Sequence, residues 1–255
     1  MTKQPTKDHC PHTALNVRKV FVLHVRKGYE KRGQHIERML GKMGVPFEYI
    51  LDGDVCDLTD DVLDRYFRGE MMKGQYPFTS CSYKHLLAYK EIEDRDIDGA
   101  LILEDDIFLK KDFIRIFNKS MDEVRKYSDE HPGPVIISYE DTRLRFIPRR
   151  KRKKDTVIYK ADRDRMTGAF YINRAAARLL TEYAETHKFE LPIDLMHCKL
   201  LRDGRLTYFW CQPTVATQGS HTGAFASAIN FKKNIFYPLS WQFKLHYRKL
   251  LYFFR

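Results

Sequence analysis

The sequence of 255 residues contains no long apolar run and no cysteine pattern typical of a metal site. Because a membrane-spanning helix needs about 20 mostly apolar residues, we expect no transmembrane segment. The first sixteen residues are polar and lack the apolar core of a secretory signal. The five cysteines are scattered and odd in number, which argues against a disulfide framework and indicates reduced thiols. These absences together predict a cytoplasmic protein.

Acidic residues are missing from two stretches that carry much of the positive charge. Residues 143–154 contain eight lysines and arginines, and residues 231–255 contain six, with no Asp or Glu in either stretch. The formal net charge is +11, so the rest of the chain is close to neutral. Two local basic patches indicate anionic partners at two places rather than a nucleic-acid-binding protein with a uniformly basic surface.

Apolar runs and helical periodicities alternate along the chain. Residues 19–25 and 45–51 are predicted strands on either side of a helix between Tyr29 and Gly44, which is a β-α-β opening. Further strands are expected at 100–103, 134–138, 156–160, 168–172 and 206–210. Further helices are expected within 57–75, from 79 onward, and at 112–126, 174–187 and 192–201. The predicted fold class is therefore α/β, with a mixed sheet flanked by helices.

Three acidic residues follow the short apolar strand that ends at Leu103. Open α/β sheets bind their ligands beyond the carboxyl ends of the strands, and Glu104, Asp105 and Asp106 occupy that place. Residues alternate sides along an extended chain, so we expect the side chains of Glu104 and Asp106 to point the same way. Paired carboxylates of this kind suit Mn²⁺ or Mg²⁺ shared with phosphate oxygens. An acidic turn that begins the next helix is the alternative, and a metal-dependent phosphoesterase or a nuclease would use the same cluster.

Six segments, in order, resemble the motifs of glycosyltransferase family 25. This family comprises bacterial lipopolysaccharide and lipooligosaccharide sugar transferases and includes the collagen galactosyltransferase domain. The segments are residues 20–25 (VFVLHV) followed by Lys31-Arg32, 47–53 (FEYILDG), 79–85 (TSCSYKH), 101–107 (LILEDDI), 167–177 (TGAFYINRAAA) and 192–194 (PID). Three positions depart from the family pattern, because His24 replaces an Asn, Ser80 a Gly and Lys84 a Ser.

The resemblance implies a GT-A-like (Rossmann-like) fold and an enzyme that inverts the anomeric carbon of a nucleotide-diphospho-sugar. It implies a UDP-sugar donor, often UDP-galactose, and an oligosaccharide or lipid-linked glycan acceptor of the lipopolysaccharide type. A divalent cation, Mn²⁺ or Mg²⁺, would stabilise the negative charge that develops on the diphosphate leaving group.

The resemblance also assigns site residues. Glu104 and Asp106 are expected to bind the metal, with His221 as a third ligand. The nucleotide-sugar contacts are expected from five residues near the strand ends and on the first helix, namely His24, Arg26, Arg32, Asp52 and Asp105. The alternatives are a core histidine at position 24, solvated arginines at 26 and 32, and a loop histidine without a role at 221.

Inverting transfer needs a general base that takes the proton of the acceptor hydroxyl. Asp194 is the first candidate for this base, and Asp141 is the second. The alternative for Asp194 is that it begins a helix after Pro192, and the two roles are compatible.

Two residues of the third segment lie on the apolar stripe of a predicted helix. The stripe consists of Cys81, His85, Ala88, Tyr89 and Ile92. We interpret His85 as a core histidine with a satisfied hydrogen bond, and Cys81 as a packing residue.

We expect a flexible N-terminus over residues 1–17, a GT-A-like catalytic domain over 18–230 and a basic amphipathic tail over 231–255. The tail places apolar residues at helical spacing and basic residues elsewhere on the helix, as in helices that bind anionic membranes. A helix packed on the body, or a dimer contact, is the alternative. Residues 149–154 (RRKRKK) are expected to bind phosphates of a lipid-linked acceptor or to form a solvated loop. The protein is therefore expected at the inner membrane as a peripheral protein, without a nucleic-acid partner, because no nucleic-acid-binding motif occurs.

Overall fold

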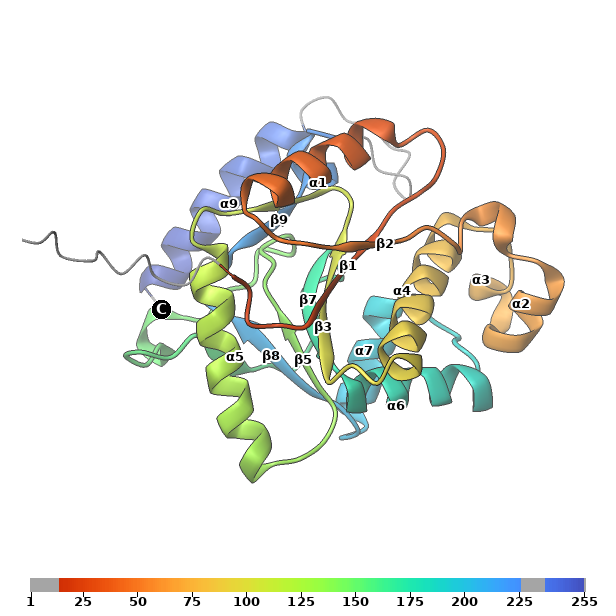
Figure 1. The fold of residues 1–255 in the computed structure, drawn as a ribbon. Coiled ribbons are helices and arrows are strands. Elements are labelled where there is room, and N and C mark those ends of the chain that lie inside the picture. Colours follow the sequence, from red (N-terminus) through yellow and green to blue (C-terminus); the bar gives the residue numbers. More distant parts are fainter. Residues whose placement is uncertain (1–13, 226–236, 255) are drawn as a thin grey trace, which may run out of the picture.

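The computed structural model describes residues 14–225 and 237–254, with a seven-stranded mixed sheet at the centre (Figure 1). The strand order is β2 (Glu48–Ile50), β1 (Lys19–Leu23), β3 (Gly99–Glu104), β7 (Ala169–Asn173), β5 (Val135–Ser138), β8 (Thr207–Cys211) and β6 (Ile158–Lys160). β1 runs parallel to β2 and β3, and β5 runs parallel to β8. β7 and β6 are antiparallel to their neighbours, which makes the sheet mixed.

Helices cover both faces of this sheet (Figure 1). One face carries α1 (Glu30–Lys42) and α5 (Phe113–Glu130), and the other carries α4 (Pro77–Asp94), α6 (Arg174–Thr186) and α7 (Ile193–Arg202). The shorter elements are η1 (Val55–Asp57), α2 (Asp60–Tyr66), α3 (Gly69–Met72) and η2 (Arg149–Lys151), and α8 (Gly219–Thr222) and α9 (Tyr237–Phe254) come last. The predicted fold class, an α/β GT-A-like mixed sheet flanked by helices, is confirmed.

The central strand β3 shows why the strands appear in the sequence as apolar runs. Leu101 and Leu103 pack in the cluster that includes α1 and α5, whereas Ala100 and Ile102 pack in the cluster that includes α4 and α6. All four side chains are fully buried. A strand covered on both faces needs apolar side chains at successive positions, because each face removes them from water.

Most predicted elements are present with shifted ends. The second strand is shorter than 45–51, because the amide of Val45 donates to the carbonyl of Leu40 (3.0 Å) and closes the end of α1. α4 begins at Pro77, two residues before its predicted start, since proline fits the first helical turn where its missing N–H is not needed. None of the helices in the described ranges is both long enough and apolar enough to cross a bilayer.

A short antiparallel ribbon of β4 (Ile107–Leu109) and β9 (Ala216–Gln218) is absent from the sequence prediction. Each strand has three residues, which is too short for a periodic pattern to reveal it. The ribbon pairs Ile107 with Gln218, so a late segment of the chain lies next to the acidic cluster. The amide of Gly219 then donates to the carbonyl of Asp106 (2.7 Å), which brings α8 to the same place.

Candidate active site

The acidic cluster lies where the parallel strands β1 and β3 end. Glu104 is the last residue of β3, and the amide of Asp105 donates to the carbonyl of Leu23 at the end of β1 (3.2 Å). The carboxyl ends of parallel strands meet at one edge of a sheet, where open α/β folds bind their ligands. The predicted position of the cluster is therefore correct.

Asp105 pairs with two of the predicted donor-binding residues. Its carboxylate lies 2.7 Å from Nδ1 of His24 and 3.0 Å from Nη1 of Arg32, which comes from α1. All three side chains are largely buried. The structure thus brings His24, Arg32 and Asp105 together as one cluster beneath the sheet edge.

Glu104 and Asp106 line one cavity of about 170 Å³. The shared cavity agrees with the prediction that alternate residues of the cluster point the same way. Arg32, Asp194 and His221 also line this cavity, although they come from α1, α7 and α8. Five of the predicted site residues therefore meet in one hollow.

Both carboxylate oxygens of Glu104 are held by hydrogen bonds. Oε1 accepts from the hydroxyl of Thr167 (2.9 Å), and Oε2 accepts from Nε2 of Gln218 (3.0 Å). Nε2 of His85 lies 3.5 Å from Oε1 on another side. Glu104 is therefore fixed in direction before any ligand arrives.

Asp106 is buried more completely, and its hydrogen bonding is incomplete. Its Oδ2 accepts from the amide of Ser220 (3.0 Å), whereas its buried Oδ1 has no hydrogen-bond partner among the described residues. Burial, with Glu104 next to it, raises the pKa of Asp106 to about 6. Two adjacent carboxylates and one unsatisfied buried oxygen fit a site for a hard divalent cation.

Asp194 lies in the first turn of α7, so it begins a helix and also faces the cavity. Burial and the nearby Asp164 raise the pKa of Asp194, although Nη2 of Arg143 lies 3.5 Å from its Oδ2. Arg143 is the first residue of the basic stretch 143–154. One end of that stretch therefore reaches the cavity.

His221 lines the cavity from α8. Burial, and then the positive charge of Arg143, lower the pKa of His221. A lowered pKa favours the neutral imidazole, which is the form that binds metals.

Two predicted donor-binding residues lie outside this cavity. Nε of Arg26 lies 3.0 Å from Asp54, and its Nη2 pairs with Asp57. The side chain of Asp52 is 83% exposed and lies 3.5 Å from Nη1 of Arg26. Neither Arg26 nor Asp52 lines the cavity of Glu104 and Asp106.

The two departures from the family motif on α4 have a structural role. The hydroxyl of Ser80 donates to the carbonyl of Gly53 (2.7 Å), and Nζ of Lys84 donates to the carbonyl of Leu51 (2.8 Å). Both residues therefore hold the turn that follows β2. Asp141, the second candidate base, is buried between Nζ of Lys110 (3.0 Å) and other partners and does not line the cavity.

Sequence reasoning missed three residues that contact the acidic pair, namely Thr167, Gln218 and Ser220. The signal that was present is the glycine next to each of them. A Cβ at Gly168 would lie 2.7 Å from the Gln218 side chain, and one at Gly219 would lie 2.8 Å from the Asp106 carbonyl. The close approach of these segments therefore needs glycine.

The interpretation of His85 as a core histidine is correct in one respect and wrong in another. The side chain is fully buried, as expected, and its ring lies 5.5 Å from the ring of Phe170. Its Nδ1, however, has no hydrogen-bond partner among the described residues. Cys81 is a packing residue that also lines the cavity.

Comparison with solved structures gives two similar chains. A protein described as a glucose-1-phosphate thymidylyltransferase from Bacillus anthracis, in complex with a sucrose, is 14% identical with a TM-score of 0.39, over 85% of this chain and 97% of that chain. A glycosyltransferase involved in the glycosylation of the major capsid of PBCV-1 is 8% identical with a TM-score of 0.40, over 91% of this chain and 99% of that chain. The search of curated proteins gave no match.

Comparison with protein families gives a match over residues 19–197, to glycosyltransferase family 25, described as LPS biosynthesis protein. The matched region is most of the chain and includes β1, the acidic cluster and the first turn of α7. The protein belongs to glycosyltransferase family 25 and is a glycosyltransferase.

Proposed function

We propose that this glycosyltransferase moves a sugar from a UDP-sugar, UDP-galactose in the first instance, to an acceptor of the lipopolysaccharide or lipooligosaccharide type, with inversion at the anomeric carbon. The observation that carries the proposal is the cavity that Glu104 and Asp106 share, in which one buried Asp106 oxygen has no partner among the described residues. A paired set of hard oxygens of this kind suits a cation shared with a diphosphate.

Mn²⁺ or Mg²⁺ would be held by Glu104 and Asp106, with His221 as the third ligand on the same cavity. When bound, such an ion supplies Lewis acidity to the diphosphate leaving group. Hydrogen bonds from Gln218 and Ser220 orient the two carboxylates, so the ligands are positioned by residues around them.

The donor diphosphate would also contact Arg32, which lines the cavity. Asp105 orients the Arg32 guanidinium, and His24 holds the other oxygen of Asp105. Arg26 and Asp52 follow β1 and β2 at the same sheet edge, and we assign them to the nucleoside end of the donor.

Asp194 would act as the general base, taking the proton of the acceptor hydroxyl onto a carboxylate oxygen as that hydroxyl attacks the sugar. Its raised pKa supports this role, because a carboxylate with a higher pKa is a stronger base. Arg143 near Asp194 would favour an acceptor that carries phosphate groups.

A membrane-bound acceptor would be reached through α9, which has a buried side and an exposed side. Trp241 is buried, and its Nε1 donates to the carbonyl of Thr142 (3.3 Å), so the helix is anchored on the body. Four large apolar side chains on the helix are exposed, namely Phe243, Tyr247, Leu250 and Phe254. They belong to the predicted apolar stripe, which therefore faces outward.

The basic stretch 143–154 lies beside this helix. The guanidinium of Arg149 lies 4.3 Å from the ring centre of Phe253, and the ring of Phe146 lies 5.7 Å from that of Tyr252. Exposed aromatic side chains with adjacent arginine suit the surface of an anionic membrane. These contacts support a peripheral protein at the cytoplasmic face of the inner membrane.

The test is ligand-induced stabilisation of the full-length protein. UDP with Mn²⁺ is expected to raise the melting temperature, and a screen of UDP- and GDP-sugars is expected to show slow hydrolysis of UDP-galactose. A short DNA duplex serves as the control for the basic stretches. Stabilisation by DNA alone, or release of inorganic phosphate from simple phosphate esters, would contradict the proposal.

A further inference from the structure

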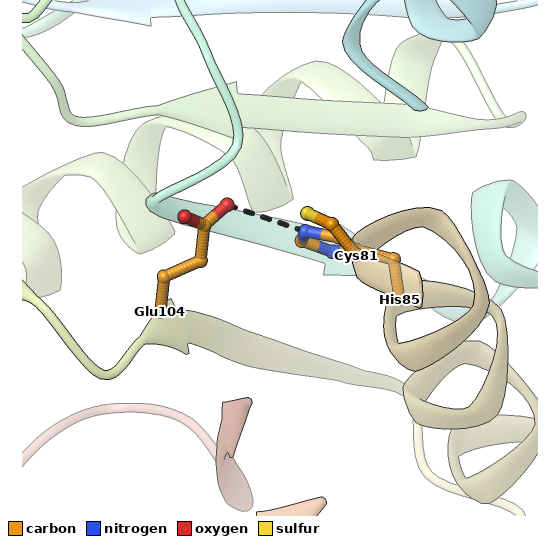
Figure 2. A group of neighbouring side chains, drawn as sticks. All are labelled: Cys81, His85 and Glu104. Atoms are coloured by element: carbon orange, nitrogen blue, oxygen red, sulfur yellow. Dashed lines mark hydrogen bonds and ion pairs between the residues drawn. The ribbon is translucent and has the colours of Figure 1, made fainter. Parts of the chain in front are cut away.

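Three side chains with different ligand atoms converge beside the cavity. Cys81 and His85 project from α4 toward Glu104 at the end of β3 (Figure 2). One sulfur, one nitrogen and one carboxylate oxygen from these residues lie within 4.8 Å of one another. Cys81 and Glu104 also line the cavity, whereas His85 is fully buried behind them.

The helix fixes two of these ligands on one face. Residues four apart in an α-helix are neighbours on its surface, so the side chains of Cys81 and His85 project together. The same spacing places pairs of histidines on zinc in helical metal sites. The ring of Phe170, 5.5 Å from the His85 ring, limits the positions that the imidazole can take.

The contact between His85 and Glu104 fits two ligands of one ion better than it fits a hydrogen bond. Nε2 and Oε1 are 3.5 Å apart, which is the outer limit for a hydrogen bond between these atoms. Zinc bonds to nitrogen and oxygen of about 2.0–2.2 Å place two ligands of a tetrahedral ion about 3.3–3.5 Å apart. The buried Nδ1 has no partner among the described residues, so no hydrogen bond there explains the ring position.

We propose that Cys81, His85 and Glu104 form a site for a thiophilic divalent ion, with Zn²⁺ as the expected occupant. Sulfur and imidazole ligands favour Zn²⁺, whereas Mn²⁺ and Mg²⁺ favour sites made of oxygens. On binding, the Cys81 thiol loses its proton to solvent and the sulfur becomes a ligand as thiolate. Three protein ligands leave a fourth position open toward the cavity that Cys81 and Glu104 line.

A second group with metal-ligand atoms, Asp54, Cys56 and Asp57, does not have the same character. Arg26 pairs with both of its carboxylates, so a cation already occupies their charge. The thiol of Cys56 is exposed. This group therefore provides the matched control.

Glu104 belongs both to this site and to the proposed Mn²⁺ site. Zn²⁺ at Cys81 and His85 would take a carboxylate oxygen from the acidic pair, so the two ions would compete. This competition rests on the proposed function, whereas the thiolate site itself does not depend on it.

The site is tested by optical titration of the reduced, metal-free full-length protein with Co²⁺, which replaces Zn²⁺ and makes thiolate ligation visible. One equivalent of Co²⁺ is expected to give a near-ultraviolet charge-transfer band, together with the visible bands of a tetrahedral ion. One equivalent of Zn²⁺ is expected to remove both. Absence of the charge-transfer band in the wild-type protein would overturn the proposal.

Variants identify the ligands. Cys81→Ser is expected to abolish the charge-transfer band, and His85→Gln is expected to weaken Zn²⁺ binding by more than the roughly 10–100-fold that loss of a second-shell partner costs. Cys56→Ser is expected to leave the band unchanged. A band that persists in Cys81→Ser, or one that disappears in Cys56→Ser, would overturn the assignment. If Cys81→Ser does not fold, Cys81→Ala and His85→Gln give the same test.

Discussion

Nη1 of Arg32 lies 3.0 Å from Oδ1 of Asp105, with both side chains largely removed from solvent. This pair joins α1 to the end of β3, and His24 holds the second oxygen of Asp105. The middle acid of the cluster is therefore neutralised on its own side. Glu104 and Asp106 are the carboxylates of the cluster that line the cavity.

Replacing Arg32 by Gln removes one partner of a buried ion pair and leaves the carboxylate of Asp105 with His24. Loss of one partner from such a pair costs about 3–5 kcal/mol. We expect the free energy of unfolding, measured by urea denaturation, to fall by an amount in that range. Arg38→Gln, at an exposed position of the same helix, is the control and should change it by less than about 0.5 kcal/mol. An equal effect of the two substitutions would contradict the burial argument.

Asp106→Asn should abolish sugar transfer while it stabilises the metal-free fold. The folded-state pKa of Asp106, about 6, lies above its ordinary value of 3.8, so folding disfavours the ionised form. The cost grows as pH rises from about 4 to about 6 and stays in full above that, at about 1–3 kcal/mol. Urea denaturation in the presence of EDTA should therefore show the variant gaining on the wild type between pH 5 and pH 7. Retained turnover with Mn²⁺ would remove Asp106 from the metal site.

Asp194→Asn removes the proposed base without removing its hydrogen-bonding shape. General-base catalysis contributes about 10²–10⁴-fold, so kcat should fall by that factor while donor affinity stays within about twofold. Asp203→Asn, just beyond the end of the same helix and exposed, is the matched control and should keep wild-type kcat. If Asp194→Asn retains more than a tenth of the activity, the base is another group.

The exposed side of α9 predicts membrane binding that depends on individual aromatic residues. Phe243→Ser and Phe254→Ser should each weaken binding to vesicles with anionic headgroups by about tenfold or more, because burying a phenylalanine stabilises by about 1.5–3 kcal/mol. The full-length protein should sediment with these vesicles more than with zwitterionic ones.

Met71→Ser is the control for these two variants, since Met71 is an exposed apolar residue on α3. It should leave vesicle binding unchanged. Deletion of residues 231–255 should release the protein. Sedimentation of the truncated form with the vesicles would show that the membrane contact lies elsewhere.

Much of the fold and part of the site could be predicted from the sequence, because long apolar segments reveal which sides of an element are buried. β3 and the acids after it follow from this pattern, as does the shared direction of Glu104 and Asp106. The ribbon of β4 and β9 does not, since three-residue strands exist through their pairing rather than through a local pattern. The contact of Gln218 with Glu104 spans 114 residues and follows from that pairing.

The same reasoning explains the misreading of position 85. Helical periodicity placed Cys81 and His85 on the buried face of α4, and they lie there. Periodicity does not reveal what lies across from a buried face. The neighbour is the carboxylate of Glu104 on β3, so a packing face also carries ligand atoms.

The β4–β9 ribbon also determines how far the chain can be shortened. The family match ends at residue 197, yet the donors that hold Glu104 and Asp106 come from Gln218 and Ser220. A fragment cut at the family boundary would keep the three acids and lose β8, β9 and α8. An expression fragment or a chimaera must therefore extend through residue 222 to keep its acidic pair oriented.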